Sequence, residues 1–328
     1  MAETCGTAPV RIVVWGAGEV FRRYANELMM RCERGEIDIV GITGKTLPPV
    51  ATLDGVPLVA REEVAALAPD YVLVMVGAQG QAIRREAMEQ FGIMRNQLID
   101  KDLLTVPCFE FRRYHRLRTS RVSIVADTCW GGFAYNTLQM ECLSPFKNMF
   151  VKEADYLRLL GDLRGYVEGC EPEYLRMQTD LAGSYYPVFM LGDVPLHFNH
   201  DATPESAMEK WHRRRVKINW DNVFVMLHTC NREAAEAFEA LPLEGGRVCL
   251  TPFAWDLPHA LQIPMANDRE VFLNNVNVTA IRGASNIAFD IVSLLLGESD
   301  VSRVSGIDVP EELRPLGEIA SERGGKLF

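Results

Sequence analysis

The features that this sequence lacks exclude several classes of protein. Among its 328 residues, no apolar run approaches the ~20 residues that a membrane-spanning helix needs. The N-terminal residues MAETCGTAP do not have the pattern of a secretory signal. The formal net charge is −10, so the chain lacks the basic footprint of a general nucleic-acid-binding protein. We therefore expect a cytoplasmic protein with no membrane span and no nucleic-acid partner.

Cysteine pairs, metal motifs and the serine-esterase elbow are also absent. The eight cysteines are scattered without a C-x-x-C pair, which favours reduced thiols over a disulfide framework or a zinc ribbon. There is no G-x-S-x-G. We assign no metal, because the possible ligands show no H-E-x-x-H or other tight spacing. These ligands are His197, His200, Asp201 and His228.

What the sequence does contain is typical of a globular α/β protein. Its length, with 48% apolar and 24% charged residues, suits about two domains. We predict two Rossmann-like domains with largely parallel sheets. The expected boundaries are residues 1–105, a basic linker at 106–120, and residues 121–328.

The first domain opens with strand, glycine turn and helix. Residues 10–15 are an apolar run of strand length, two glycines follow, and a helical pattern runs to residue 28. A second glycine loop follows the predicted strand at 71–76. The predicted cofactor-binding residues are Gly16, Gly18, Gly77 and Gly80. The dinucleotide fingerprint is incomplete, because Phe21 replaces its third small residue and Thr43 replaces the ribose-binding acid.

Three stretches of this domain, VWGAGEV, LDGVPLV and DYVLVMVGA, carry a resemblance. They resemble the N-terminal Rossmann-like domain of bacterial sugar acyltransferases and related polysaccharide enzymes. The resemblance implies a domain that binds a nucleotide-sugar or serves as a scaffold. NAD(P) is the alternative cofactor, and a degenerate domain with no ligand is the simpler explanation.

The linker is strongly basic. Arginine occupies positions 112, 113, 116, 118 and 121, with no acid after Glu110. Such a segment can meet phosphates or an anionic membrane surface. A solvated connecting helix, or a contact with an acidic neighbouring surface, is the simpler and more common explanation.

In the second domain, polar residues gather after three predicted strands. DTCWGG follows the strand at 122–125, PLHFNHD follows the strand at 188–191, and HTCN follows the strand at 223–227. Because ligands bind outside the carboxyl ends of parallel strands, these loops are the predicted site. The predicted catalytic residues are Asp127, His200, Asp201 and His228, with either histidine as the base for a sugar hydroxyl.

Other residues in and near these loops are predicted to bind substrate. They are Cys129, Trp130, Gly131, Gly132, His197, Asn199, Arg213, Arg214 and Asn219. We expect the two adjacent glycines to allow a tight or left-handed turn, the indole to stack on a sugar ring, and the arginines to hold a diphosphate or an acidic sugar. Asn274, Asn275 and Asn277 are possible partners for hydroxyl groups.

Simpler explanations stand beside these assignments. The arginines can complement a helix C-terminus, Asp201 can cap a helix, and His197 can point into the core. Cys129 is either a small buried side chain or a nucleophile with a histidine base.

The second domain also looks like a known family, on the evidence of SIVADTCWGGFAYNTLQMECLSPFKNMF, PLHFNHDATPESAMEKWHRRRVKIN and WDNVFVML. It resembles, over about residues 120–260, a bacterial family of unknown function whose members are commonly labelled exopolysaccharide-biosynthesis proteins or acyltransferases. The resemblance implies motif positions at Cys129, Trp130, Gly131, Gly132, Ser144, Pro145, His200, Trp211, Arg214 and Asn219. Thr128 and Asp201 depart from the Asn and Tyr common in that pattern.

These observations support three hypotheses. The first is a glycosyl- or acyltransferase-like enzyme of surface-glycan assembly that acts on a nucleotide-sugar or glycan. The second is an NAD(P)-dependent oxidoreductase. The third is a non-enzymatic nucleotide-sugar-binding partner in a polysaccharide assembly, and the chain can also form a homo-oligomer.

Overall fold

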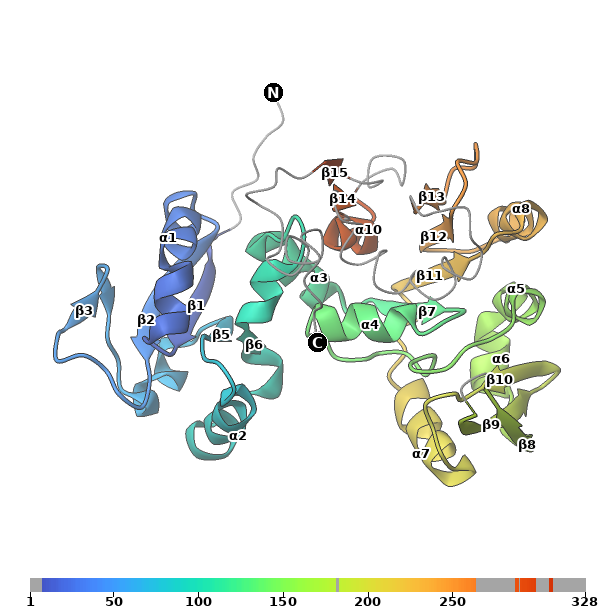
Figure 1. Ribbon diagram of the computed structural model, residues 1–328, viewed down its shortest axis with the longest axis horizontal. Coiled ribbons are helices and arrows are strands. Elements are labelled where there is room, and N and C mark those ends of the chain that lie inside the picture. The colour runs from blue at the N-terminus through green and yellow to red at the C-terminus, as the bar shows by residue number, and fades with distance from the viewer. Residues whose placement is uncertain (1–7, 181–182, 264–286, 289, 299–306, 309–328) are drawn as a thin grey trace. The chain divides into compact units, whose positions relative to one another are not determined.

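The computed structural model describes residues 8–180, 183–263, 287–288, 290–298 and 307–308, and it divides into two compact units (Figure 1). Unit 1 is Met1–Arg116 and unit 2 is Leu117–Phe328. The division falls inside the basic segment at 106–120. Both units contain a parallel sheet with helices, so the predicted α/β class is confirmed.

The sheet of unit 1 is parallel, in the strand order β2-β1-β5-β6. Its strands are β1 (Val10–Trp15), β2 (Ile37–Thr43), β5 (Tyr71–Val74) and β6 (Leu98–Asp100). The two central strands are almost continuously buried and apolar, as expected where both faces of a parallel sheet are covered.

Two helices and several short elements complete unit 1. The helices are α1 (Glu19–Glu33) and α2 (Gly80–Phe91), and β3 (Thr52–Leu53) pairs with β4 (Val56–Pro57). After β4 the chain forms two short 3-10 turns, η1 (Arg61–Glu63) and η2 (Ala65–Leu67). Two further 3-10 turns are η3 (Arg95–Gln97) and η4 (Lys101–Thr105).

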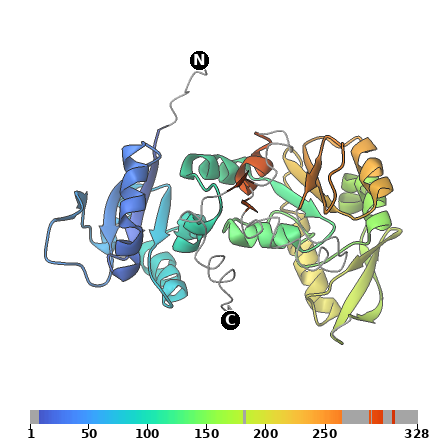
Figure 2. The ribbon, with the colours of Figure 1, turned by 45° about the horizontal axis from the view of Figure 1, so that its top comes forward.

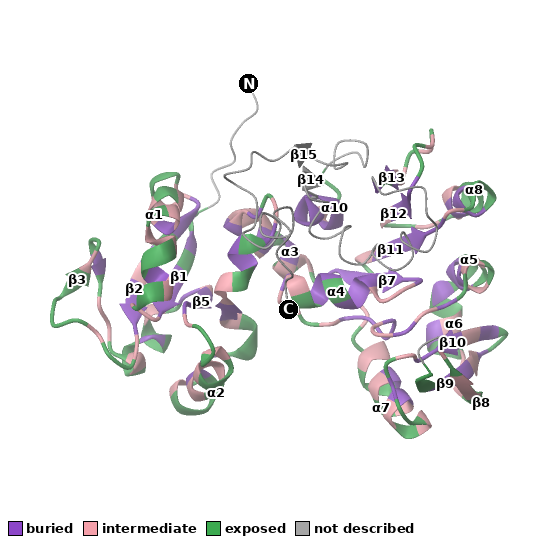
Figure 3. Ribbon diagram, viewed as in Figure 1, coloured by how far each residue is buried: buried purple, intermediate pink, exposed green. Residues whose placement is uncertain are grey.

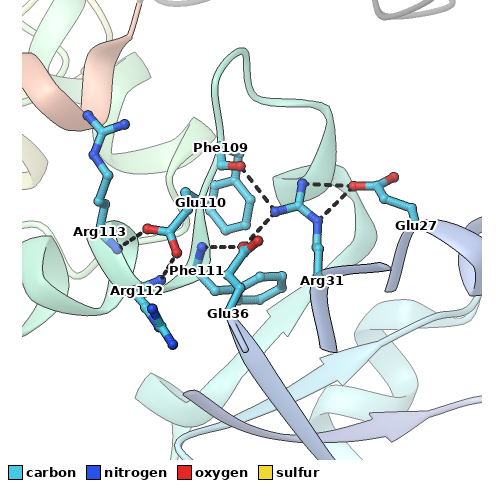
Figure 4. Close-up of polar contacts among 8 residues, drawn as sticks. All are labelled: Glu27, Arg31, Glu36, Phe109, Glu110, Phe111, Arg112 and Arg113. Atoms are coloured by element: carbon cyan, nitrogen blue, oxygen red, sulfur yellow. Dashed lines mark hydrogen bonds and ion pairs between the residues drawn. The ribbon is translucent and has the colours of Figure 1, made fainter. Parts of the chain in front are cut away.

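A buried ion pair fixes the start of α3 (Phe111–Ser120) against the rest of unit 1 (Figure 4). Glu36 accepts hydrogen bonds from the Arg31 guanidinium (2.6 Å) and from the backbone N–H of Phe111 (2.7 Å). Arg31 also bonds Glu27 and the carbonyl of Phe109. Most of this network is withdrawn from water, and it joins α1 and the residue before β2 to residues 109–111. We call this network the clasp of unit 1.

The basic segment at 106–120 therefore packs and bonds as part of the fold. It leads into α3, whose apolar face is fully buried through Phe111, Tyr114 and Leu117. Arg112 bonds the carbonyl of Gly35, and Glu110 accepts the backbone N–H of Arg113 (2.8 Å). These contacts fit the connecting-helix explanation of the basic run.

The main sheet of unit 2 is also parallel, in the order β13-β12-β11-β7. Its strands are β7 (Ser123–Ala126), β11 (Val223–His228), β12 (Gly246–Thr251) and β13 (Ala260–Gln262). Figure 2 shows the last three, in orange, side by side. Among the described residues, the helices that follow β7 in the unit are α4 (Trp130–Thr137), α5 (Glu153–Gly161), α6 (Leu163–Gly169), α7 (Pro204–Arg215), α8 (Arg232–Ala240) and α10 (Ile291–Leu296).

One strand prediction in unit 2 is wrong in its placement. The run at 188–191 belongs to β9 (Tyr185–Leu191), which lies between β8 (Pro172–Thr179) and β10 (Val194–His197) in a separate antiparallel sheet. The short chain between β9 and β10 allows only an antiparallel hairpin, because a parallel pair needs a crossover of a dozen or more residues. The remaining two-stranded pair is β14 (Ile287–Ala288) with β15 (Ile307–Asp308).

Helices cover both faces of the parallel sheet of unit 2 (Figure 3). Val125 and Val225 belong to a core that includes residues of α5, α7 and α8. Ile124 and Phe224 point to the opposite face, because neighbouring side chains of a strand alternate, and there Trp130 of α4 stacks on Phe224. The carboxyl ends of β7 and β11 are thus held between two packed layers.

Candidate functional site

A pocket of about 210 Å3 lies at the carboxyl ends of β7 and β11. The two strands pair in parallel, with Ala126 opposite Met226, so the residues that follow them meet at one edge of the sheet. The pocket is lined by Asp127, Thr128, Phe150, Val151, Glu153, His228, Thr229 and Cys230. Two of the three predicted loops are therefore adjacent.

Asp127 and His228 form a buried pair in this pocket. They are 4% and 8% exposed, and Oδ2 of Asp127 lies 3.1 Å from Nδ1 of His228. Oδ1 of the same carboxylate accepts the backbone N–H of His228 (3.3 Å). Burial raises the pKa of Asp127, and the adjacent imidazole opposes that rise.

The carboxylate determines the tautomer of the imidazole. An ionised Asp127 only accepts hydrogen bonds, so Nδ1 of His228 carries the proton that it donates. In the neutral ring the basic nitrogen is then Nε2. A histidine oriented in this way by a buried carboxylate is the arrangement that general-base catalysis uses.

Glu153, at the first position of α5, is a pocket residue that our sequence reasoning missed. Its carboxylate accepts the hydroxyl of Thr229 and the side-chain N–H of Asn231 (3.4 Å). Asn231 also accepts the N–H of Glu233, which caps α8. An acid in a first helical turn is common, and only the packing of α5 beside α8 brings this one to the pocket.

The third predicted loop reaches the site through Cys129 and His200. Sγ of Cys129 lies 3.2 Å from Nε2 of His200, which is exposed. Cys129 directly precedes α4. Burial raises the pKa of its thiol, and a hydrogen bond with Asn199 opposes this. The loop after β10 is therefore drawn to the end of β7, although its strand is not part of the parallel sheet.

Asp201 and His197 have other surroundings. Asp201 is buried, accepts the hydroxyl of Ser206 (2.9 Å) and pairs with Lys210, both of α7. His197 is buried and stacks on Phe150, with ring centroids 4.4 Å apart. Asp201 thus binds side chains of α7 but does not cap the helix, because Thr203 accepts the backbone N–H of Ser206. His197 packs in the core, as its simpler explanation has it.

Trp130, Gly131 and Gly132 correct our expectation of a loop. All three belong to the first turn of α4, and neither glycine has a positive φ. Trp130 is fully buried, so it does not stack on a ligand. A Cβ on Gly132 would lie 2.8 Å from Oδ1 of Asn148, and a Cβ on Gly131 would lie 3.2 Å from Ile124. The glycines let the helix pack closely.

The predicted arginine clamp is also absent. Arg213 pairs with Glu209 of its own helix (3.2 Å), and Arg214 bonds the carbonyl of Lys147 (3.0 Å). Asn219 bonds the Ser123 hydroxyl through its backbone N–H (2.8 Å) and the carbonyl of Arg121 through its side chain (3.1 Å). These contacts tie chain segments together, and among the described residues the two arginines bond different partners, not a common group of oxygens.

Other motif positions of the second-domain resemblance are structural as well. Ser144 is buried and accepts the backbone N–H of Phe146 (3.2 Å), and Pro145 beside it is buried. Trp211 is fully buried against Phe146. Asn274, Asn275 and Asn277 lie outside the described residues.

The glycine loops of unit 1 do not fit a nicotinamide cofactor. Thr43, at the ribose position, is fully buried and donates its hydroxyl to the carbonyl of Val59 (2.9 Å). Glu19 places a negative charge in the first turn of α1, where a phosphate would bind. Gly16 has φ +121°, and a Cβ at this position would lie within 2.9 Å of Met75 and Val76. Close packing therefore explains this glycine without a ligand. Gly77 and Gly80 border α2, with no tight contact.

Two searches of the described residues bear on cofactors and membranes. They contain no group of three or more His, Cys, Asp or Glu side chains arranged to hold a metal ion. None of their helices combines the length and apolar character needed to cross a membrane.

Comparison with known proteins gives families without an assigned activity. Residues 101–295, more than half of the chain, match the model of a family described as a domain of unknown function (DUF1919). Residues 9–99 match a family described as C2185-like, N-terminal. An uncharacterised protein of Haemophilus influenzae is 30% identical over 112 residues. The match covers 34% of this chain and 52% of the relative, so the chain spans about half the length of that protein.

Proposed function

The chain belongs to the DUF1919 family, and from the site it carries we propose that it transfers an acyl or glycosyl group to a hydroxyl of a sugar or glycan acceptor. His228 is the general base that takes the proton of this hydroxyl. Asp127 holds the imidazole and stabilises its charge once the proton has been taken. The one observation that carries the proposal is the buried contact of 3.1 Å between Asp127 and His228 inside a pocket.

The composition of the pocket supports an uncharged acceptor. Its lining holds the carboxylates of Asp127 and Glu153, the hydroxyls of Thr128 and Thr229, and no lysine or arginine among the described residues. A phosphate or carboxylate would meet repulsion there, whereas a hydroxyl can donate to these oxygens. The sequence resemblance to exopolysaccharide-biosynthesis proteins supports a surface-glycan precursor as the acceptor.

Binding is the first property to measure. Thermal shifts of the full chain with UDP, CDP, UDP-sugars, coenzyme A, NAD(P) and simple glycosides test which class of ligand stabilises it. A ligand at 100 times its Kd adds about 2.7 kcal/mol, which gives a clear shift. Stabilisation by NAD(P) alone would contradict the proposal and support the oxidoreductase hypothesis.

Turnover tests the base directly. With donors and acceptors from that panel and product detection by mass spectrometry, His228→Asn is expected to lose a factor of roughly 10²–10⁴ in kcat. Asp127→Asn is expected to lose a similar factor. The amide oxygen must accept the backbone N–H of His228, so the NH2 group faces Nδ1 of the imidazole. Nδ1 must then accept, which puts the proton on Nε2, the wrong tautomer for a base.

The matched control is His212→Asn, because His212 is an exposed histidine of α7 that lies 3.8 Å from Glu171. This variant is expected to keep full activity. Equal turnover in all four proteins would sink the proposal. Ligand binding without turnover in any of them would favour the binding-partner hypothesis.

A further inference from the structure

Cys129 and His200 form a second reactive pair beside the pocket. Their Sγ and Nε2 atoms are 3.2 Å apart, within the reach at which a histidine removes a thiol proton. The pair is contributed by two chain segments, the residues that open α4 and the loop between β10 and α7. We propose that Cys129 is a nucleophile that carries an acyl group as a thioester before His228 directs the acceptor to it. This inference rests on the proposed function and narrows it to acyl transfer.

Cys129 follows directly on two residues that line the pocket, and on this ground we assign both pairs to one substrate. Asp127 and Thr128, the two residues before it, both line the pocket, and the charge of Asp127 acts on the Cys129 thiol. The protein thus places the Cys129 thiol and two imidazoles around the ends of β7 and β11, where the pocket also holds Cys230. A single base would serve direct transfer. Two bases suit a reaction with two proton transfers, one from the thiol and one from the acceptor.

The first half-reaction loads the thiol from an acyl thioester donor. His200 takes the thiol proton through Nε2 while Sγ forms a bond to the carbonyl carbon of the donor. The carbon–sulfur bond of the donor then breaks, and the imidazolium returns its proton to the departing thiolate. Burial raises the pKa of Cys129, so its resting form is the thiol and the reaction needs this base.

The second half-reaction passes the acyl group to the acceptor. His228 takes the proton of the acceptor hydroxyl as its oxygen bonds to the carbonyl carbon of the thioester. The bond between that carbon and Sγ breaks, and the proton returns to the thiolate of Cys129. The sum is thioester plus alcohol giving ester plus thiol, with no oxidant or reductant.

The side chains favour acyl over glycosyl transfer. Covalent glycosyl transfer uses a pair of carboxyl groups on either side of the anomeric carbon, one of them as the nucleophile. Here Asp127 is held by His228, and Glu153 is held by Thr229 and Asn231. The contact that resembles an activated nucleophile is the thiol–imidazole pair, which suits attack on a carbonyl carbon.

The first residues of α4 add electrostatic support. A helix leaves its first N–H groups without partners inside the helix, and they carry partial positive charge. Cys129 directly precedes this turn, in which Gly131 and Gly132 have no side chains. A negative oxygen that develops on a carbonyl bonded to Sγ would therefore form next to hydrogen-bond donors.

The experiment is to trap the acyl-enzyme on the full chain. The protein is incubated with acetyl-coenzyme A or p-nitrophenyl acetate, quenched in acid and mapped by mass spectrometry. We expect one acetyl group on Cys129 that neutral hydroxylamine removes. His200→Asn should slow its formation by roughly 10²-fold, and the adduct should accumulate in His228→Asn when a glycoside acceptor is present.

Cys32→Ala is the matched control. Cys32 is another half-buried cysteine, it lies in unit 1, and burial raises its pKa too. Its loss should leave the adduct unchanged, whereas Cys129→Ala should abolish it. Alkylation of Cys129 by iodoacetamide, compared between the natural chain and His200→Asn, gives a second readout that does not depend on replacing the cysteine. We expect the histidine variant to be alkylated at least about tenfold more slowly at neutral pH.

The outcomes separate the two proposals. No adduct with either probe, or an adduct elsewhere than Cys129, overturns the thioester, even if His228→Asn still loses turnover. An adduct on Cys129 that passes to a glycoside equally fast in His228→Asn keeps the thioester and overturns the role of His228.

Discussion

The two units of this protein start from the same plan and differ at the ends of their strands. In unit 1, β1 leads through Gly16 and Gly18 into α1, and its neighbour β2 ends at Thr43. In unit 2, β7 leads through Asp127 and Cys129 into α4, and its neighbour β11 ends at His228. Both sheets are parallel, so both present these residues at the edge where α/β proteins bind ligands.

The difference shows that a fold provides a position and the side chains provide the chemistry. In unit 1 the strand ends carry glycines and a threonine whose hydroxyl bonds the backbone. In unit 2 they carry a carboxylate, an imidazole and a thiol. The ordinary explanation of unit 1 is a scaffold, and unit 2 carries the candidate chemistry. Three further predictions test this division, in order of expected size.

Removing Glu36 tests whether unit 1 is a scaffold held by its own clasp. Glu36→Ala removes the carboxylate that accepts from both the Arg31 guanidinium and the Phe111 N–H, and it leaves Arg31 with Glu27 as its carboxylate partner. Because two hydrogen bonds with a charged group are lost, we expect a loss of roughly 3–5 kcal/mol in the free energy of unfolding of unit 1. Urea unfolding, with hydrogen exchange to locate the unit that opens, measures it. Glu19→Ala is the control, because Glu19 is an exposed helix acid whose pair with Arg23 contributes little. If turnover fell in proportion to the stability of unit 1, unit 1 would contribute to activity, and the assignment of the chemistry to unit 2 alone would be wrong.

The two glycines of the first turn separate packing from ligand binding. Gly16→Ala strains a left-handed residue and places a Cβ 2.8 Å from the carbonyl oxygen of Met75, so we expect it to cost roughly 2–4 kcal/mol. Gly18→Ala meets nothing within 4 Å and has a negative φ, so we expect a change of about 0.5 kcal/mol or less. Thermal melts compare the two variants. A nucleotide-dependent shift that Gly18→Ala abolishes would instead make this turn a binding site.

His197 gives the smallest effect and concerns the core beneath the site. Burial, with help from Lys152 and Arg176 and against Asp155, lowers its pKa to about 4. The folded state therefore resists protonation. The stability that the neutral ring contributes is complete above pH ~6.5 and is lost as the pH falls from there to about 4, by at most ~3 kcal/mol.

His197→Phe keeps the stacking on Phe150 and removes two ring nitrogens that have no hydrogen-bond partner among the described residues. We expect its stability at pH 7 to be equal or slightly higher, and its acid unfolding between pH 6.5 and 4 to be less steep. Denaturant melts at several pH values test this. His212→Asn should keep the original pH profile, and an unchanged profile in His197→Phe would mean that His197 is not the group that titrates.

Much of the fold could be predicted because it depends on local pattern. The apolar runs of β1, β2, β7 and β11, and the helices after them, follow from periodicity and from turn residues. The cap of α7 at Thr203 and the left-handed Gly297 after α10 also depend on local residue types, because a threonine caps the first and a glycine allows the second. The antiparallel placement of β9 was missed, because an apolar run does not record which strand it pairs with.

The site was partly predictable for the same reason. Asp127 and His228 follow two apolar runs, and parallel pairing brings such residues together, so they could be named without knowing the strand order. Trp130 and the two glycines after it were misplaced, because a turn and the first turn of a helix share the same residue types. Glu153 had no local signal at all.

The sequence by itself determined the α/β class, the buried strands and the types of side chain available for chemistry, because these depend on composition and on near neighbours along the chain. Only the tertiary structure decided which of those side chains meet. The contact of Asp127 with His228 joins residues 101 positions apart, and that of Cys129 with His200 joins residues 71 positions apart. Strand order and loop packing set such contacts. The same folding buried Trp130, paired Asp201 with Lys210 and gave Arg213 and Arg214 different partners. Contacts of this range follow from the packing of the whole core, which no short stretch of sequence encodes.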